Sequence, residues 1–143
     1  MYISTSKKQT EDIAFEYGQT AKPGDIFCLT GGLGAGKTAF SGGFAKGAGY
    51  LGRVTSPTFT LMNIYESERF TIYHFDLYRL KNEADLENIG FDEYINSDGV
   101  VLIEWPEKAL PLLTERYTSV DIKIISKDDK ECREIIIREN FGT

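Results

Sequence analysis

Residues 26–38 of this chain read IFCLTGGLGAGKT, and this stretch decides the fold. Residues 26–29 form an apolar run of the length of a buried strand, and residues 31–38 match G-x-x-x-x-G-K-[ST] in full. In such a loop the glycines let backbone N–H groups surround phosphate groups, and the positive end of the following helix strengthens that field. A chance match is expected in about one chain in 200 of this length. The motif therefore predicts a P-loop that binds ATP or ADP with magnesium, in which Lys37 reaches the β- and γ-phosphates and Thr38 coordinates the metal.

Signals on both sides of this loop predict strands that alternate with helices. Ser6 followed three residues later by Gln9 has the pattern of a capping box, which opens a helix extending to about residue 20. A second helix is expected from 37 to about 48. Its Gly42 and Gly43 each cost about 1 kcal/mol relative to alanine, and we expect close packing against the sheet to explain them. The remaining expected elements are strands at 2–3, 59–65, 70–75 and 100–103, a short acidic helix at 82–88, a turn at 91–95, and a closing hairpin of 117–125 with 132–138.

This order of elements predicts one α/β domain covering residues 1–143, a three-layer P-loop NTPase-like fold with a central mixed sheet. An apolar share of 41% suits a packed core, and no run approaches the ~20 apolar residues of a membrane helix. Cys28 and Cys132 lie far apart, so we expect two reduced cysteines in a cytoplasmic protein. The net charge of −6 argues against extensive direct contact with nucleic acid, whose affinity comes mainly from neutralised phosphates.

Two acids are candidates for the magnesium shell that accompanies a P-loop. Glu104 ends the apolar run 100–103, and Asp76 ends the strand expected at 70–75. Either could instead be a solvated carboxylate at a strand terminus. His74, the single histidine, is more typical of a packing residue than of a catalytic one, and Trp105 is typical of a core or site-wall residue. The hydroxyl-rich segment 55–59 has two open interpretations, a phosphate-sensing switch or the entry to a strand.

Four blocks of sequence, in this order and spacing, resemble one known family. They are GAGKT at 34–38, SPTFTL at 56–61, HFDLYRL at 74–80 and EWP at 104–106. The combination resembles the TsaE family, also called YjeE, of small bacterial ATPases needed to make threonylcarbamoyladenosine in tRNA. The resemblance covers roughly residues 3–138, and the second pair of blocks is much more specific than a P-loop alone.

The resemblance implies a role for each of several residues. Lys37 and Thr38 would handle phosphate and magnesium, Glu104 would join the magnesium shell, and Asp76 would support hydrolysis. Segment 56–58 would be the switch loop. The residues expected at the nucleotide are Gly32, Leu33, Gly34, Ala35, Gly36, Lys37, Thr38 and Ala39, together with Ser6 in the N-terminal segment and Arg133 late in the chain. The resemblance also implies that the protein assists the TsaD–TsaB complex, meets tRNA only through it, and does not itself transfer the threonylcarbamoyl group.

Three rival functions differ in how far the sequence supports them. A P-loop small-molecule kinase would need an acceptor pocket and an arginine-bearing lid, for which this chain has few arginines and no long insertion. A GTPase would need a guanine-reading N-K-x-D segment, which is absent. A nucleotide-dependent interaction module without useful hydrolysis stays open. Arg53 and Arg79, which flank the switch-like segment and the Asp76 strand, are candidates for an arginine finger within the chain or for ordinary surface residues.

Overall fold

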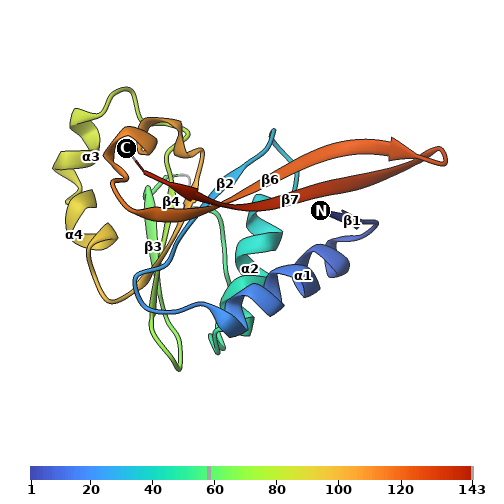
Figure 1. Ribbon diagram of the computed structural model, residues 1–143, viewed down its shortest axis with the longest axis horizontal. Helices are drawn as coiled ribbons and strands as arrows, with labels where there is room; N and C mark the ends of the chain where they lie inside the picture. The colour runs from blue at the N-terminus through green and yellow to red at the C-terminus, as the bar shows by residue number, and fades with distance from the viewer. Residues whose placement is uncertain (58, 143) are drawn as a thin grey trace.

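The computed structural model describes residues 1–57 and 59–142. Within this part of the chain, seven strands form one mixed sheet in the order β1-β7-β6-β2-β5-β4-β3, with helices on both faces (Figure 1). The strands are β1 (Tyr2–Ser4), β2 (Ile26–Thr30), β3 (Met62–Glu66), β4 (Thr71–Asp76), β5 (Val100–Glu104), β6 (Arg116–Lys127) and β7 (Lys130–Phe141). The helices are α1 (Lys7–Thr20), α2 (Lys37–Gly47), α3 (Ala84–Asn88) and α4 (Phe91–Ile95), with 3₁₀ turns η1 (Pro106–Lys108) and η2 (Leu110–Leu112).

The three layers follow from the alternation of side chains along the central strands. Phe27 and Leu29 of β2 belong to the core beneath α1 and α2, whereas Ile26 and Cys28 belong to the core beneath α3, α4 and the 3₁₀ turns. The continuous apolar run in β2 therefore reflects burial on both faces. The predicted three-layer α/β fold with a mixed sheet is confirmed.

Helices α1 and α2 approach each other so closely that glycine is required where they meet. A Cβ atom added to Gly43 would overlap the backbone of Glu11 in α1, and one added to Gly18 would overlap the backbone of Phe44 in α2. Gly42, by contrast, could carry a Cβ atom, whose nearest neighbour, Val54, would lie at an ordinary contact distance of 3.9 Å. The expectation that these glycines pack against the sheet is wrong, because the close partner of Gly43 is the neighbouring helix.

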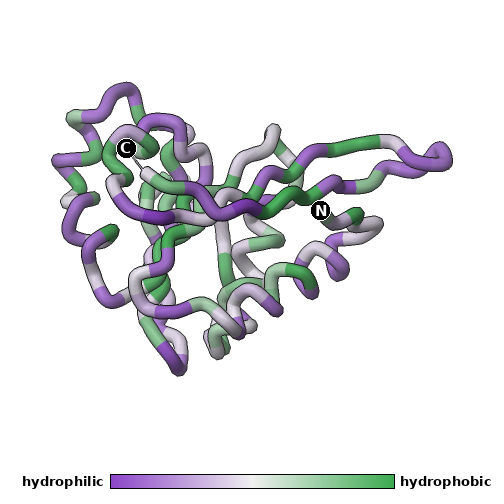
Figure 2. Tube along the Cα trace, viewed as in Figure 1, coloured by the Kyte–Doolittle hydropathy of each residue, from purple (hydrophilic) through white to green (hydrophobic). Residues whose placement is uncertain are grey.

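Most predicted elements are present, with shifted boundaries. Ser6 caps α1 by accepting a hydrogen bond from the Gln9 backbone N–H at 3.1 Å, as expected. Strand β3 begins three residues later than expected, since residues 59–61 form a turn in which Leu61 has a φ of 66°. Residues 91–95 form helix α4 rather than a turn. The closing hairpin is longer than expected, and its hydrophilic far end extends beyond the body of the molecule (Figures 1 and 2).

Both cysteines are free and buried in the core. In the described part of the chain, no helix combines the length and apolar character needed to cross a membrane.

Candidate nucleotide site

Parallel pairing brings the P-loop and both candidate acids to one edge of the sheet. Strands β2, β5 and β4 are parallel neighbours, in which Leu29 pairs with Glu104 and Glu104 pairs with Asp76. The carboxyl ends of parallel strands meet at the same edge, where ligands of open α/β sheets bind. The loop that follows β2 therefore lies beside the two carboxylates that end β5 and β4.

The backbone of the loop depends on its glycines. Gly31, Gly34 and Gly36 have φ values of 153°, 77° and 116°, which lie in the region that favours glycine. At Gly31, an added Cβ would also lie 2.6 Å from the carbonyl oxygen of Ile122 in β6. Gly36 precedes α2 without a side-chain cap, so the first N–H groups of that helix remain available to an anion.

The side chain of Lys37 folds back into the loop that precedes it. Its Nζ donates hydrogen bonds to the carbonyl oxygens of Gly31 at 2.6 Å and Gly32 at 3.0 Å. The ammonium group also lies 4.2 Å from the centroid of the Trp105 ring, a cation–π distance. Burial lowers the pKa of Lys37, and the negative charge of Glu104 is the largest influence opposing that shift. The Lys37 side chain is thus held largely out of solvent, inside the loop.

A cavity of about 340 Å³ joins this lysine to the candidate metal ligands. Thr38, Asp76 and Glu104 line it with a hydroxyl and two carboxylates, which are oxygen donors of the kind that magnesium prefers. Among residues 1–57 and 59–142, no group of three or more His, Cys, Asp or Glu side chains could hold a metal ion. The donor set fits magnesium bound by few protein ligands, with phosphate and water oxygens completing the shell.

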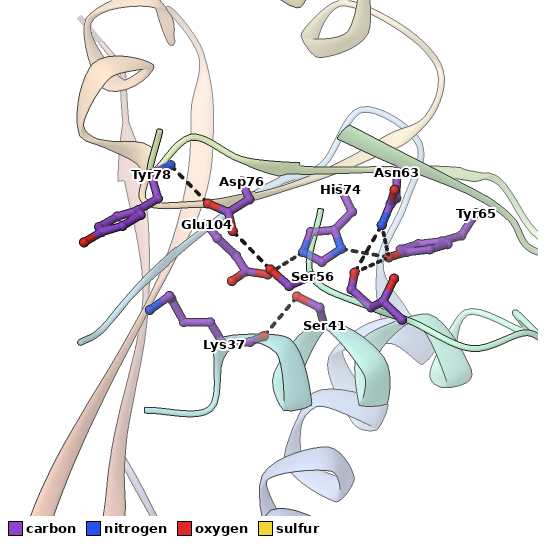
Figure 3. Close-up of polar contacts among 10 residues, drawn as sticks. Lys37, Ser41, Ser56, Asn63, Tyr65, His74, Asp76, Tyr78 and Glu104 are labelled. Carbon is purple, nitrogen blue, oxygen red and sulfur yellow. Dashed lines mark hydrogen bonds and ion pairs between the residues drawn. The ribbon is translucent and has the colours of Figure 1, made fainter. Parts of the chain in front are cut away.

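Asp76 is held by the segment predicted to be a switch. The Ser56 hydroxyl donates to Oδ2 of Asp76 at 3.1 Å, and the Tyr78 backbone N–H donates to Oδ1 at 3.0 Å (Figure 3). The carboxylate is only 4% exposed, so its orientation is fixed from inside the protein. Ser56 and Pro57 are described, whereas Thr58, the third residue of the predicted switch segment, lies outside the described residues.

Glu104 is held by His74, a contact that sequence reasoning missed. His74 is completely buried, and its Nε2 lies 2.5 Å from Oε2 of Glu104 (Figure 3). Its Nδ1 lies 3.0 Å from the hydroxyl of Tyr65. The interpretation of His74 as a satisfied packing residue covers its burial but not its contact with a candidate metal ligand. The available signal was its place two residues before Asp76, since alternate residues of a strand share a face.

A second cavity of about 360 Å³ lies on the other side of the loop. Ser6, Thr10 and Arg133 line it, and β1 pairs with β7 so that Ser4 lies opposite Arg133. The Arg133 guanidinium donates to the carbonyl oxygens of Ala35 at 2.8 Å and Gly34 at 3.2 Å. The two cavities share Gly34, Gly36 and Ala39 in their linings, so they lie on either side of the same loop.

The remaining predicted residues divide among these cavities. Leu33 lines the cavity that contains Lys37, Thr38, Asp76 and Glu104, named the phosphate-side cavity. Ala35 lines the second cavity, and Gly32 lies on a neighbouring groove toward β6. Arg53 lines a further cavity that meets the phosphate-side cavity at Thr38, Ala39 and Ser56. The Arg79 guanidinium lies 5.1 Å from the centroid of the Phe59 ring.

Comparison with known proteins identifies the family of this chain. The family model described as Threonylcarbamoyl adenosine biosynthesis protein TsaE matches residues 4–135. A Rickettsia prowazekii (strain Madrid E) protein named tRNA threonylcarbamoyladenosine biosynthesis protein TsaE is 39% identical over 142 residues, covering 99% of this chain and 96% of the relative. The protein of the same name from Bacillus subtilis (strain 168) is 39% identical over 128 residues, covering 90% of this chain and 80% of the relative.

A solved structure extends the likeness to the fold. The crystal structure of Bacillus subtilis YdiB superposes with a TM-score of 0.80 at 35% sequence identity, covering 99% of this chain and 84% of that one. The chain therefore belongs to the TsaE family, which is named for the biosynthesis of threonylcarbamoyladenosine in tRNA.

Proposed function

We propose that this protein is a cytoplasmic ATPase that binds ATP or ADP with magnesium and acts as an accessory factor to a TsaD–TsaB complex in threonylcarbamoyladenosine synthesis. One observation carries the proposal: Lys37, Thr38, Asp76 and Glu104 line a single cavity at the start of α2. A triphosphate laid along the loop would meet backbone N–H groups, an ammonium group and metal-binding oxygens together. The nucleoside would then lie in the second cavity, beside Ser6 and Arg133.

Each residue has a part in hydrolysis that its surroundings support. Lys37 neutralises charge on the transferred phosphate, where the low-dielectric setting strengthens its effect. Thr38 and Glu104 would hold magnesium, which when bound neutralises charge on the β- and γ-phosphate oxygens. Asp76, fixed by two hydrogen bonds, can orient the attacking water and take up its proton on a carboxylate oxygen.

We expect slow turnover by the isolated chain, because one recurring component is missing from the cavity. An arginine aimed at the transferred phosphate contributes about 10³–10⁵-fold in related reactions. Among the described residues that line the phosphate-side cavity, none is an arginine. Arg53 lines an adjoining cavity and Arg79 follows Tyr78, which lines this one, so an arginine finger from within the chain is the alternative to one supplied by the partner complex.

Contact with tRNA would be indirect, through the partner complex. The net charge of −6 supports this division of labour, since direct binding relies on clustered lysine and arginine.

Steady-state ATP turnover, measured for the chain alone and with excess TsaD–TsaB, tests the proposal. We expect slow turnover alone and a changed rate on assembly. Glu104→Gln and Asp76→Asn should abolish turnover in both settings. Fast turnover that the partners leave unchanged, and that Arg53→Ala or Arg79→Ala abolishes, would refute partner dependence.

Phosphoryl transfer to a small molecule instead of water would replace the ATPase with the kinase alternative. Failure of the chain to bind nucleotide at all would refute the site itself.

A further inference from the structure

A buried chain of hydrogen bonds connects Glu104 to the segment before Pro57. His74 lies 2.5 Å from Glu104 through Nε2 and 3.0 Å from the Tyr65 hydroxyl through Nδ1, and that hydroxyl lies 3.1 Å from the Thr55 carbonyl oxygen. His74 is completely buried, Glu104 is 3% exposed and Tyr65 is 4% exposed. Figure 3 shows these groups in a row above the start of α2. Contacts in such a dry setting hold one arrangement firmly.

The available protons assign a donor to the contacts at both ends of this chain. The side-chain amide of Asn63 has two N–H groups, which lie 3.2 Å from the Thr55 carbonyl and 3.4 Å from the Tyr65 oxygen. The single O–H of Tyr65 donates to the Thr55 carbonyl oxygen, and the Tyr65 oxygen accepts from Asn63 and faces Nδ1 of His74. Because a carboxylate oxygen accepts, the 2.5 Å contact with Oε2 of Glu104 places a proton on Nε2 of His74.

The same short segment also holds the second acid. Ser56, adjacent to Thr55, donates its hydroxyl directly to Asp76 at 3.1 Å. Residues 55 and 56 therefore reach both carboxylates of the phosphate-side cavity, Glu104 through two intervening side chains and Asp76 directly. A displacement of this segment would release both acids together.

We propose that His74 is a positioning residue that orients Glu104 and couples it, through Tyr65, to segment 55–56. The proposal rests on the role given to Glu104 in the proposed function. With Oε2 committed to His74, the other carboxylate oxygen is directed away from the histidine, as Figure 3 shows. Partners of this kind orient metal ligands, and their loss typically reduces metal affinity or activity about 10–100-fold.

Two substitutions of His74 separate positioning from packing. Glutamine can place an amide N–H near the position of Nε2 and keep the donor to Glu104, whereas asparagine reaches only the position of Nδ1 and loses it. We expect His74→Asn to raise the magnesium concentration for half-maximal turnover by about tenfold, and His74→Gln to restore most of that loss. ADP affinity measured without magnesium should be unchanged in both. Equal magnesium requirements in the two variants would reduce His74 to a packing residue and overturn the proposal.

The link to segment 55–56 is tested with Tyr65→Phe, which removes one hydroxyl and keeps the ring. We expect faster backbone amide hydrogen exchange at residues 53–57 and a lower turnover rate. Tyr17→Phe is the matched control, since it removes a hydroxyl that bonds to Tyr2 at 3.1 Å, outside the linings of both nucleotide cavities. If Tyr65→Phe behaves like this control, the coupling is refuted.

A spectroscopic measurement on the ligand-free chain is independent of activity. The chain has one histidine, so the imidazole ¹⁵N NMR spectrum reports a single ring. We expect a proton on Nε2 of His74, and an unprotonated Nε2 would overturn the assignment. Glu104→Gln completes the series: if turnover and magnesium dependence survive that change, the proposed function fails at Glu104. If Glu104→Gln abolishes turnover but the His74 and Tyr65 variants behave like the wild type, the positioning proposal fails and the proposed function stands.

Discussion

The substitution Lys37→Met distinguishes the contribution of this lysine to nucleotide binding from its contribution to folding stability. A nucleotide at about one hundred times its Kd stabilises the native state by about 2.7 kcal/mol. At about 2–4 °C per kcal/mol, this raises the melting temperature of a domain near this size by about 5–10 °C. Losing a charge-assisted hydrogen bond costs about 1.5–3 kcal/mol, which weakens binding by roughly 10–100-fold. At the same nucleotide concentration the variant should therefore gain only about 0.4–1.4 kcal/mol, and its shift should fall to half or less.

The ligand-free variant should melt close to the wild type, because the loss of the Lys37 hydrogen bonds to Gly31 and Gly32 is offset by removal of a desolvated charge, while methionine keeps the apolar stem. The pKa of Lys37 is lowered by burial from its ordinary value of 10.5. Just below that pH the unfolded state consequently binds more protons, so the wild type gains stability relative to the variant as pH rises. Lys46→Met, at the exposed end of the same helix, is the control and should keep the full nucleotide shift. Differential scanning fluorimetry gives the melting temperatures of the wild type, Lys37→Met and Lys46→Met, with and without nucleotide. An undiminished shift in Lys37→Met would refute the phosphate site.

Three further predictions use single measurements. Trp105 is the only tryptophan and its ring lies 4.2 Å from the Lys37 ammonium, so ADP with magnesium should change its fluorescence; an unchanged spectrum despite calorimetrically proven binding would contradict this contact. Gly43→Ala should destabilise the chain by about 1–3 kcal/mol in urea unfolding, because its Cβ would overlap α1, while Gly42→Ala, which has space, should stabilise it by about 0.5–1 kcal/mol. Arg133→Ala, which loses two bonds to the loop, should weaken ADP binding on the order of tenfold by calorimetry; unchanged affinity would exclude Arg133 from the site.

Local sequence was enough to predict the phosphate loop and its flanking elements. The loop could be recognised from the spacing of residues 31–38, because all the residues of the motif lie in one turn and the start of one helix. Glu104 could be anticipated because an apolar run of strand length ends at it. The expected strand at 59–65 began too early, because the aromatic and β-branched residues there favour a strand while Leu61 adopts a positive φ.

Features that depend on pairing between distant segments could not be predicted from local sequence alone. Ser4 and Arg133 face each other only because β1 adds to the edge of β7, and nothing local to either strand specifies that partner. For Arg133 the prediction came from family resemblance. The glycines of α2 were attributed to the wrong neighbour for the same reason, since the close approach of α1 is a tertiary property.

The register between β4 and β5 determines both the packing of the core and the positions of the site residues. Asp76 pairs with Glu104 across these strands, and His74, two residues earlier on the same face of β4, lies diagonal to Glu104. Phe75, between them, points to the opposite face and belongs to the core beneath α3 and α4. A slip of one residue would place Phe75 on the polar edge and turn His74 and Asp76 into that core. The burial of Phe75 therefore also holds the two acids and the histidine in position, so the same apolar packing that stabilises the sheet fixes the geometry of the candidate catalytic residues.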